Sequence, residues 1–254
     1  MRIATFNLWN NPTLWSERIE SICATVKMID ADVLAFQEVK TYVEGEQRIS
    51  VAEQIANETG YPFCVFLAYP DSPDEGLAIL SNIPLDTHDA IWHHDVEEAN
   101  YCAMRVTFQA ADHAFGLTNV HLNWRSPDIR ETQVRAVREW IGEGERYELL
   151  CGDFNDNPQS EIYRDLTAHR WIDVATCHRG GDEPTLDYRH NPYLKQDALL
   201  KRPSRYDWML LRHDEGNVPL ISSVDVFGKT SDSITDANVV PSDHYGVLLD
   251  LDIS

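Results

Sequence analysis

The stretch GDFNDNP, residues 152–158, sets three polar side chains, Asp153, Asn155 and Asp156, between a glycine and a proline. It directly follows YELLC, residues 147–151, an apolar run that is typical of a buried strand. Because glycine and proline mark turns, the strand would carry these carboxylate and amide groups to its own exposed C-terminal end. The residues alone leave two interpretations: a polar turn, or a place where a metal ion and a phosphate are bound.

Polar side chains also stand where other apolar runs begin or stop. They are Asn7 after IATF, Glu38 at the end of VLAFQE, His121 at the end of GLTNVH, Asp207 at the start of DWMLL, and Asp243 and His244 before YGVLLDL. Any one of them would be an ordinary turn residue, cap or core histidine. Their recurrence at strand ends predicts a single site assembled at one edge of the structure.

With 254 residues, 43% of them apolar, and no repeat or linker, the sequence predicts one packed domain over residues 1–254. Helical spacing is expected at 14–29 and at 128–141, with Asp128 as N-cap and a further helix starting at Pro158. Strands are expected at 1–6, 33–36, 63–67, 77–80, 102–108, 114–121, 147–151, 207–211 and 246–251. Many strands with few helices favour an α+β fold of packed sheets.

The five cysteines are odd in number and widely spaced, so we expect reduced core residues rather than disulfides or a zinc site. They are Cys23, Cys64, Cys102, Cys151 and Cys177. No apolar run approaches the roughly 20 residues that span a bilayer. We expect a monomer in the cytoplasm, although a chain trimmed of a signal would look the same.

The formal charge of −21 is the most informative feature of the composition. Such a surface repels polyanions and anionic lipid head groups unless clustered arginines or a divalent cation reverse the field locally. Solubility alone would explain the acidity equally well. A glycine- and proline-broken segment from about 178 to 205 is either a functional loop or a surface excursion pinned by its aromatic residues.

Seven motifs, in this order, resemble those of the endonuclease/exonuclease/phosphatase superfamily, which includes deoxyribonuclease I. They are TFNLW, FQEV, EGLAILSNIP, NVHL, GDFN, RYDWMLL and SDH, and the match extends over residues 3–251. The resemblance implies a four-layer αββα sandwich, deoxyribonuclease I-like, and phosphoester hydrolysis assisted by Mg²⁺ or Mn²⁺. Glutamate oxygens such as those of Glu38 are hard ligands that suit Mg²⁺.

The resemblance also implies roles for single residues. Glu38 would be the main metal ligand, with Asn7 and Asp243 near the ion. Asp153 and Asn155 would orient the attacking water and hold the phosphate. His244 would pair with Asp207, His121 would pair with Glu75, and Arg105 would bind phosphate. A carboxylate partner favours the imidazolium form, so both histidines are expected to be cationic donors. Trp124 follows the His121 motif, and we expect it to form a wall of the pocket.

Two departures from the family pattern narrow the interpretation. Trp9 stands where some members have an acidic residue, which favours one strongly bound ion over two. Phe154 and the triplet 156–158 do not match the tyrosyl-DNA phosphodiesterase form of the fourth motif, so that activity is not assigned.

Three functions remain. The leading one is a metal-dependent phosphohydrolase, without a covalent nucleophile, acting on a small or partly apolar phosphoester such as a lipid head group. The second is a DNA endonuclease or exonuclease, disfavoured by 21 basic against 42 acidic residues, although four arginines between 125 and 138 follow His121. The third, an inactive binding module, is opposed by the intact carboxylates and histidines.

Overall fold

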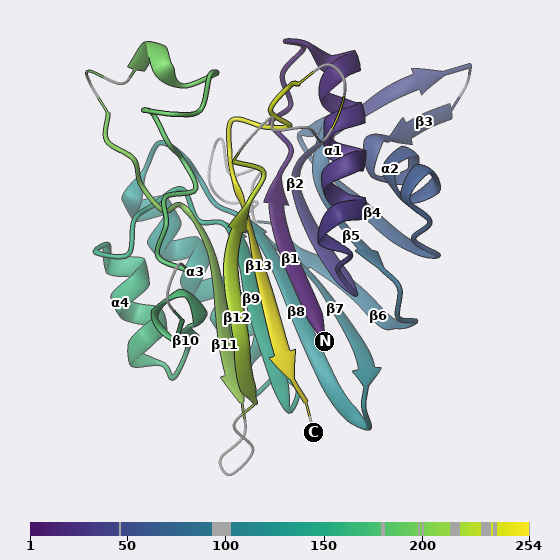
Figure 1. The fold of residues 1–254 in the computed structure, drawn as a ribbon. Coiled ribbons are helices and arrows are strands. Elements are labelled where there is room, and N and C mark those ends of the chain that lie inside the picture. Colours follow the sequence, from purple (N-terminus) through teal and green to yellow (C-terminus); the bar gives the residue numbers. More distant parts are fainter. Residues whose placement is uncertain are drawn as a thin grey trace.

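Two β-sheets pack face to face, and helices cover the outer side of each sheet (Figure 1). The computed structural model describes residues 1–45, 47–92, 103–178, 181–197, 199, 201–213, 219–229, 235 and 238–253. The first sheet contains β1 (Arg2–Asn7), β2 (Val33–Glu44), β3 (Gln47–Ser50), β4 (Phe63–Tyr69), β5 (Ser72–Ser81), β12 (Leu220–Phe227) and β13 (Gly246–Asp252). The second contains β6 (Leu85–Ile91), β7 (Ala103–Ala110), β8 (His113–His121), β9 (Tyr147–Asp153), β10 (Ile172–Asp173) and β11 (Asp207–His213).

The helices are α1 (Trp15–Ile29), α2 (Val51–Thr59), α3 (Pro127–Ile141) and α4 (Glu161–Ala168), with short 3₁₀ turns at Val174–Thr176 and Lys195–Asp197. The strand order is β12-β13-β1-β2-β5-β4 in the first sheet, where β3 also pairs with β2, and β10-β11-β9-β8-β7-β6 in the second. α1 and α2 lie outside the first sheet and α3 and α4 outside the second (Figure 1). The predicted α+β class and four-layer αββα architecture are confirmed.

Side-chain alternation along the strands builds a separate apolar core between each pair of layers. On β1, Ile3 enters the core between the sheets, whereas Ala4 and Phe6 face α1. On β9, Leu149 lies between the sheets, whereas Leu150 packs toward α3 and α4. Both sheets are therefore buried on two faces at their centres, and each strand end can present a polar group only at the edge.

The expected helices form, with corrected starts. α3 is capped by Ser126, whose hydroxyl accepts the N–H of Ile129, and not by Asp128. α4 is likewise capped by Ser160, so Pro158 precedes this helix and does not begin it. α2 was not predicted, although Ser50 and Glu53 form a reciprocal capping box, a pattern typical of the start of a helix.

The expected strands form and most are longer than predicted, with residue 102 outside the described part of the chain. β6 and β12 were missed because both are edge strands with many exposed polar residues, which weakens their apolar pattern. Of the cysteines, Cys23 and Cys151 are buried as expected, Cys64 is partly buried and Cys177 is exposed; all four are free thiols. Cys102 lies outside the described residues. Among the described residues, no helix has the length and apolar content to cross a membrane.

Gly152 makes the close contact between β8 and β9 possible. Its φ is +132°, and a Cβ at this position would lie 2.0 Å from the carbonyl oxygen of Val120. We therefore expect Gly152→Ala to reduce the free energy of unfolding by at least about 2 kcal/mol, measured by urea denaturation. Gly60→Ala is the matched control, because Gly60 also has a positive φ, +87°, but nothing lies within 4 Å of the added carbon. Equal losses in the two variants would show that the contact with Val120 does not matter.

Candidate active site

The predicted site residues meet at one edge of the two sheets. β1 and β2 run parallel, as do β8 and β9, so their C-terminal ends share this edge, where β11 and β13 begin. Asn7, His121, Asp153 and Asp207 continue the alternation that faces the space between the sheets. They extend the buried inter-sheet core at its end, and their relative exposures are 0%, 3%, 1% and 0%.

Glu38 reaches the same place through a break in its strand. The β2–β5 pairing shifts between Phe36 and Val39, and Glu38 has a φ of 52°. This left-handed conformation costs a non-glycine residue about 1–2 kcal/mol, and such strain is often found at functional sites. The bulge turns the Glu38 carboxylate toward the second sheet.

Asn7 holds two carboxylates together. Its amide Nδ2 donates to Glu38 Oε1 and to Asp153 Oδ2, each at 3.1 Å, while its Oδ1 accepts the backbone N–H of Trp9 at 2.9 Å. The Trp9 N–H requires an acceptor, so this contact fixes which way the amide points. Asn7 was predicted to lie near the ion as a ligand. In the structure its amide nitrogen orients the two carboxylates, and its oxygen is bonded to the Trp9 N–H.

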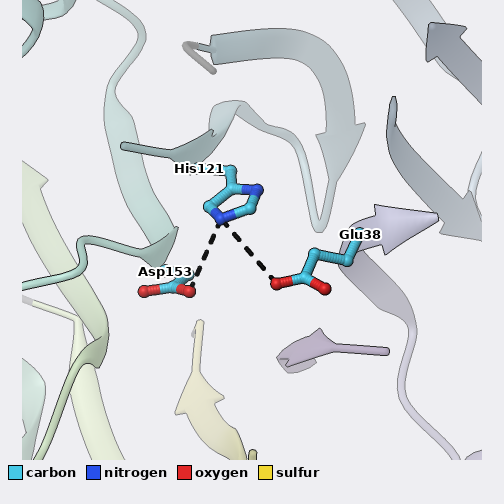
Figure 2. Close-up of side chains that lie close together, drawn as sticks. All are labelled: Glu38, His121 and Asp153. Atoms are coloured by element: carbon cyan, nitrogen blue, oxygen red, sulfur yellow. Dashed lines mark ion pairs between the residues drawn. The ribbon is translucent and has the colours of Figure 1, made fainter. Parts of the chain in front are cut away.

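His121 stands between these carboxylates. Its Nε2 lies 3.7 Å from Asp153 Oδ2 and 4.0 Å from Glu38 Oε1, and Figure 2 shows the ring facing both. Its Nδ1 lies 2.9 Å from the hydroxyl of Tyr69, a fully buried residue at the end of β4. Burial lowers the pKa of His121 to about 4 despite the charge of Glu38. Burial thus favours the neutral imidazole, against the expectation that His121 is a cationic donor.

Glu75 is not placed as the partner of His121. Its Oε2 accepts from the side-chain amide of Asn10 at 2.8 Å, and the backbone N–H of Asn10 donates to Glu38 Oε2 at 2.9 Å. Burial, followed by the charge of Glu38, raises the pKa of Glu75 to about 7. Tyr69 takes the place that the sequence reasoning assigned to Glu75, and Glu75 instead supports Glu38 through Asn10.

His244 and Asp207 form the expected pair. His244 Nδ1 lies 2.9 Å from Asp207 Oδ2, and its Nε2 lies 3.9 Å from Asp153 Oδ2. Burial opposes the imidazolium form, but the charges of Asp207 and Asp153 outweigh it and raise the pKa of His244 well above its usual value. Burial raises the pKa of Asp153 to about 7 in spite of the charge of His244.

Two buried carboxylate oxygens have no hydrogen-bond partner in the described structure: Asp207 Oδ1 and Asp243 Oδ1. An unpaired carboxylate oxygen is costly to bury unless a cation or a donor satisfies it. Burial accordingly raises the pKa of Asp243 to about 6. Separately, the side chains of Glu38, His121 and Asp153 have possible ligand atoms within 4.8 Å of one another, as do those of Asp153, Asp207 and His244. The site is a concentration of hard donors that fits a divalent cation.

Asn155 lies beside Asp153 in a strained turn with a φ of 51°. Its backbone N–H donates to Asp153 Oδ1 at 2.8 Å, and its Nδ2 donates to the carbonyl of Leu122 at 2.9 Å. A primary amide carries two hydrogens, so this bond leaves one for a phosphate oxygen. In the next positions Asp156 pairs with Arg130 and Asn157 accepts the backbone N–H of Gln159, so neither caps α4.

Arg105 does not belong to the site. Met104 and Val106 face the core between the sheets, so Arg105 points to the opposite face of β7, toward the α3 and α4 layer. There it makes a bidentate ion pair with Glu148, at 2.9 and 2.7 Å. The predicted phosphate contact is therefore wrong. Trp124 is 58% exposed beneath the guanidinium of Arg125, and within the described ranges no contact places it in the pocket wall that we expected.

Two of the four arginines that follow Trp124 are held by groups within the described part of the chain. Arg130 is held by Asp156 at 2.7 Å and by the carbonyl of Asn123, and Arg138 pairs with Asp165 at 3.2 Å. Both guanidiniums are partnered within the chain, which leaves less positive charge for a polyanion than their number suggests.

The long segment of the sequence from 178 to 205, in its described parts, is tied to the site. Asn191 donates from its amide to the carbonyls of Ser242 and Asp243, at 3.0 Å each. Tyr193 packs on Trp9, with ring centroids 4.6 Å apart, and buried Arg18 lies 4.5 Å above the Trp9 ring. These contacts favour the functional interpretation of this loop. The sequence reasoning missed Tyr69, Arg18 and Asn191; of these, only the aromatic Tyr69 at a strand end carried a local signal.

Comparison with known proteins agrees with this geometry. The sequence profile of the endonuclease/exonuclease/phosphatase family matches residues 4–244. Among functionally curated proteins, no sequence matches the chain significantly. Similar solved structures include an endonuclease/exonuclease/phosphatase from Bacteroides vulgatus, with 18% identity and a TM-score of 0.77 over 100% of this chain and 98% of that one.

Two further structures share the fold. D. rerio TDP2 complexed with a single-strand DNA product has 15% identity and a TM-score of 0.79, covering 100% of this chain and 99% of that one. Staphylococcus aureus beta toxin has 15% identity and a TM-score of 0.75, covering 98% and 99%. At these identities the likeness shows the architecture alone, whereas the profile match covers nearly the whole chain. The chain therefore belongs to the endonuclease/exonuclease/phosphatase family, a superfamily of hydrolases that act on phosphoester bonds.

Proposed function

We propose that this protein is a divalent-cation-dependent phosphohydrolase that cleaves a phosphoester, most favourably a diester, by in-line attack of water. The observation that carries the proposal is the meeting of Glu38, Asp153 and His121 with the Asp207–His244 pair at one sheet edge. The family generally uses divalent metals, and the acidic groups of this edge suit such an ion. If the protein were an inactive binding module, the free-energy cost of burying these charged groups would have no functional explanation.

The chain's own residues would hold Mg²⁺ or Mn²⁺ through Glu38, with Asp243 and its unpartnered oxygen beside it. When bound, such an ion neutralises negative charge on the phosphate oxygens. A single ion remains our expectation, because Trp9 supplies no second carboxylate next to Asn7. The hard oxygen donors make Mg²⁺ and Mn²⁺ more suitable than softer metals.

The remaining groups divide the work on the reacting atoms. Asp153 would orient the attacking water or accept its proton. Asn155 would donate its second amide hydrogen to a phosphate oxygen, since the first is bonded to the carbonyl of Leu122. His244, held protonated by Asp207, would donate to the phosphate as a cation. His121 would donate from Nε2 while its Nδ1 accepts from the Tyr69 hydroxyl.

We propose a small-molecule or lipid-head-group phosphoester as the substrate, in preference to nucleic acid. The net charge of −21 opposes a polyanion at long range, and Arg130 and Arg138 are engaged in internal ion pairs. A DNA substrate would need a basic groove that these contacts do not supply.

A substrate panel tests the proposal. We expect bis-p-nitrophenyl phosphate, and either sphingomyelin or a phosphoinositide, to be hydrolysed with Mg²⁺ or Mn²⁺. Activity should vanish with EDTA and return when the metal is restored, because the acidic site needs a cation to approach a phosphate. Asp153→Asn should lower kcat at least about a hundredfold and serves as the control against contaminating activity. Full turnover after chelation would contradict the metal site, and efficient plasmid nicking that collapses with added salt would make the protein a nuclease.

The protonation of His244 should depend on Asp207. Because its folded pKa is raised, the stabilisation from this pair is complete below about pH 6.5, the ordinary histidine value, and is lost as pH rises through the folded pKa. In metal-free Asp207→Asn the charge is gone and burial dominates, so the pKa of His244 should fall below about 6.5. Imidazole NMR titration of both proteins measures this. An unchanged pKa in the variant would show that Asp207 does not set the charge of His244.

Tyr69 and His121 should act as a unit. We expect Tyr69→Phe to lower kcat about tenfold and His121→Ala at least about a hundredfold, since the hydroxyl orients the ring. The double variant should be no slower than His121→Ala alone, because the role of Tyr69 is lost with the ring. Glu75→Gln combined with His121→Ala is the matched control and should be additive. Additive effects for Tyr69 would mean that it does not work through His121.

A further inference from the structure

A buried polar cluster joins the two sheets directly beneath the site. It comprises Thr5 on β1, Gln37 on β2 and Asn119 on β8, each with a relative exposure of 0%. The Gln37 amide Nε2 donates to Asn119 Oδ1 at 2.7 Å and to Thr5 Oγ1 at 3.0 Å. Gln37 immediately precedes Glu38, and Asn119 lies two residues before His121. The cluster therefore connects the strand that carries the main acidic group to the strand that carries the histidine.

Asn119 also bonds to the backbone of both strands, β2 and β5, next to the break in the first sheet. Gln37 and Glu38 together oppose a single residue of β5, because the pairing moves from Phe36↔Ala78 to Val39↔Gly76. The Asn119 Nδ2 donates to the carbonyl of Phe36 at 2.9 Å and to that of Ala78 at 3.2 Å. Asn119, from the second sheet, thus bonds to both β2 and β5 at the point where the bulge begins.

The chemistry leaves one orientation for these amides. Carbonyl oxygens only accept hydrogen bonds, so the nitrogen of Asn119 must face Phe36 and Ala78, and its oxygen must face Gln37. The nitrogen of Gln37 must then face Asn119. Each amide thus fixes the orientation of the other, while Gln37 Oε1 is buried without a hydrogen-bond partner in the described structure.

The hydrogen bonds of Asn119 and Gln37 fix the position of one sheet relative to the other more precisely than apolar packing does. The contacts between the sheets are largely hydrophobic, and hydrophobic contacts are non-directional, so they set the sheet separation better than the register of one strand end against another. Yet the approach of His121 Nε2 to Glu38 Oε1, at 4.0 Å, spans the two sheets. Directional bonds from Asn119 to the bulge fix this register.

We propose that Asn119, with Gln37, is a positioning residue that holds the Glu38 bulge in place and thereby sets the affinity of the site for its divalent cation. The inference rests on the proposed function, because it takes Glu38 as the main ligand of that ion. It concerns the chain's own residues and is tested on binding, not on turnover.

The experiment measures Mn²⁺ binding by isothermal titration calorimetry and thermal unfolding by circular dichroism on the full chain. Asn119→Asp keeps the size of the side chain but turns an oxygen toward two carbonyls, and Asn119→Ala removes the bonds altogether. We expect both variants to bind Mn²⁺ at least about tenfold more weakly than the wild type, a usual result of losing support behind a metal ligand. Binding as tight as that of the wild type in a folded Asn119 variant would overturn the inference.

Two controls separate positioning from general stability. Thr118→Val changes the neighbouring buried residue, whose hydroxyl has no hydrogen-bond partner in the described structure and which points to the opposite face of β8. Val106→Ala opens the core between the sheets on β7 and should lower the melting temperature. Both should bind Mn²⁺ as the wild type does. If Val106→Ala weakens binding as much as the Asn119 variants, the effect is one of stability and the inference fails.

Gln37→Met covers the case in which both Asn119 variants fail to fold, because it removes one end of the bridge and leaves the carbonyl bonds in place. It should weaken Mn²⁺ binding several-fold, and binding equal to that of the wild type would then overturn the inference. Glu38→Gln distinguishes the two levels of proposal. If the wild type binds no Mn²⁺, or if Glu38→Gln binds it as tightly as the wild type, the proposed metal site fails and the inference fails with it. If Glu38→Gln loses Mn²⁺ binding but the Asn119 and Gln37 variants bind as the wild type does, the inference alone fails.

Discussion

Mutual repulsion among buried carboxylates is the constraint on which this structure depends. Glu38, Asp153, Asp207 and Asp243 gather at the end of a hydrophobic core, where a low dielectric strengthens repulsion between like charges. Nothing in the attraction between apolar side chains would bring them together. The fold must hold them there by directed bonds from elements that are themselves rigid, and the two-sheet frame with helices on both outer faces supplies these.

Strain gathers at the same place. Trp9, Glu38 and Asn155 all adopt positive φ values, between 51° and 56°, and all lie within the turns that carry the acidic groups. Two of these backbones are held by a neighbouring side chain: Arg18 donates to the carbonyl of Trp9, and Asp153 accepts the N–H of Asn155. Strain of this kind persists only where surrounding contacts determine the conformation. The rigid frame therefore maintains a charge arrangement that the isolated turns would not adopt.

Strand alternation was enough to predict an α+β fold of packed sheets and the polar residues at strand ends, because alternation along a strand is a local property. The four-layer arrangement came from the resemblance of the motifs to the family. Arg105 shows the limit of reading motifs without that alternation: its neighbours Met104 and Val106 are both apolar, and this pattern already indicates that Arg105 faces away from the core between the sheets. Tyr69 and Asn119 could not be predicted in the same way. Their roles come from contacts across 52 and 82 residues of sequence, which the local pattern does not encode.

The two histidines show how a single partner can decide a chemical role. Both rings are buried, and both have Nδ1 at 2.9 Å from an oxygen atom. For His244 that oxygen belongs to the carboxylate of Asp207, which stabilises the imidazolium. For His121 it belongs to the neutral hydroxyl of Tyr69, and the cost of burial outweighs the charge of Glu38. The two environments thus shift the pKa values of two histidines in opposite directions, although both rings lie within 4 Å of the same Asp153. A fully cationic pair would neutralise the carboxylates that a divalent ion needs, whereas one cation and one neutral donor leave them free to bind it.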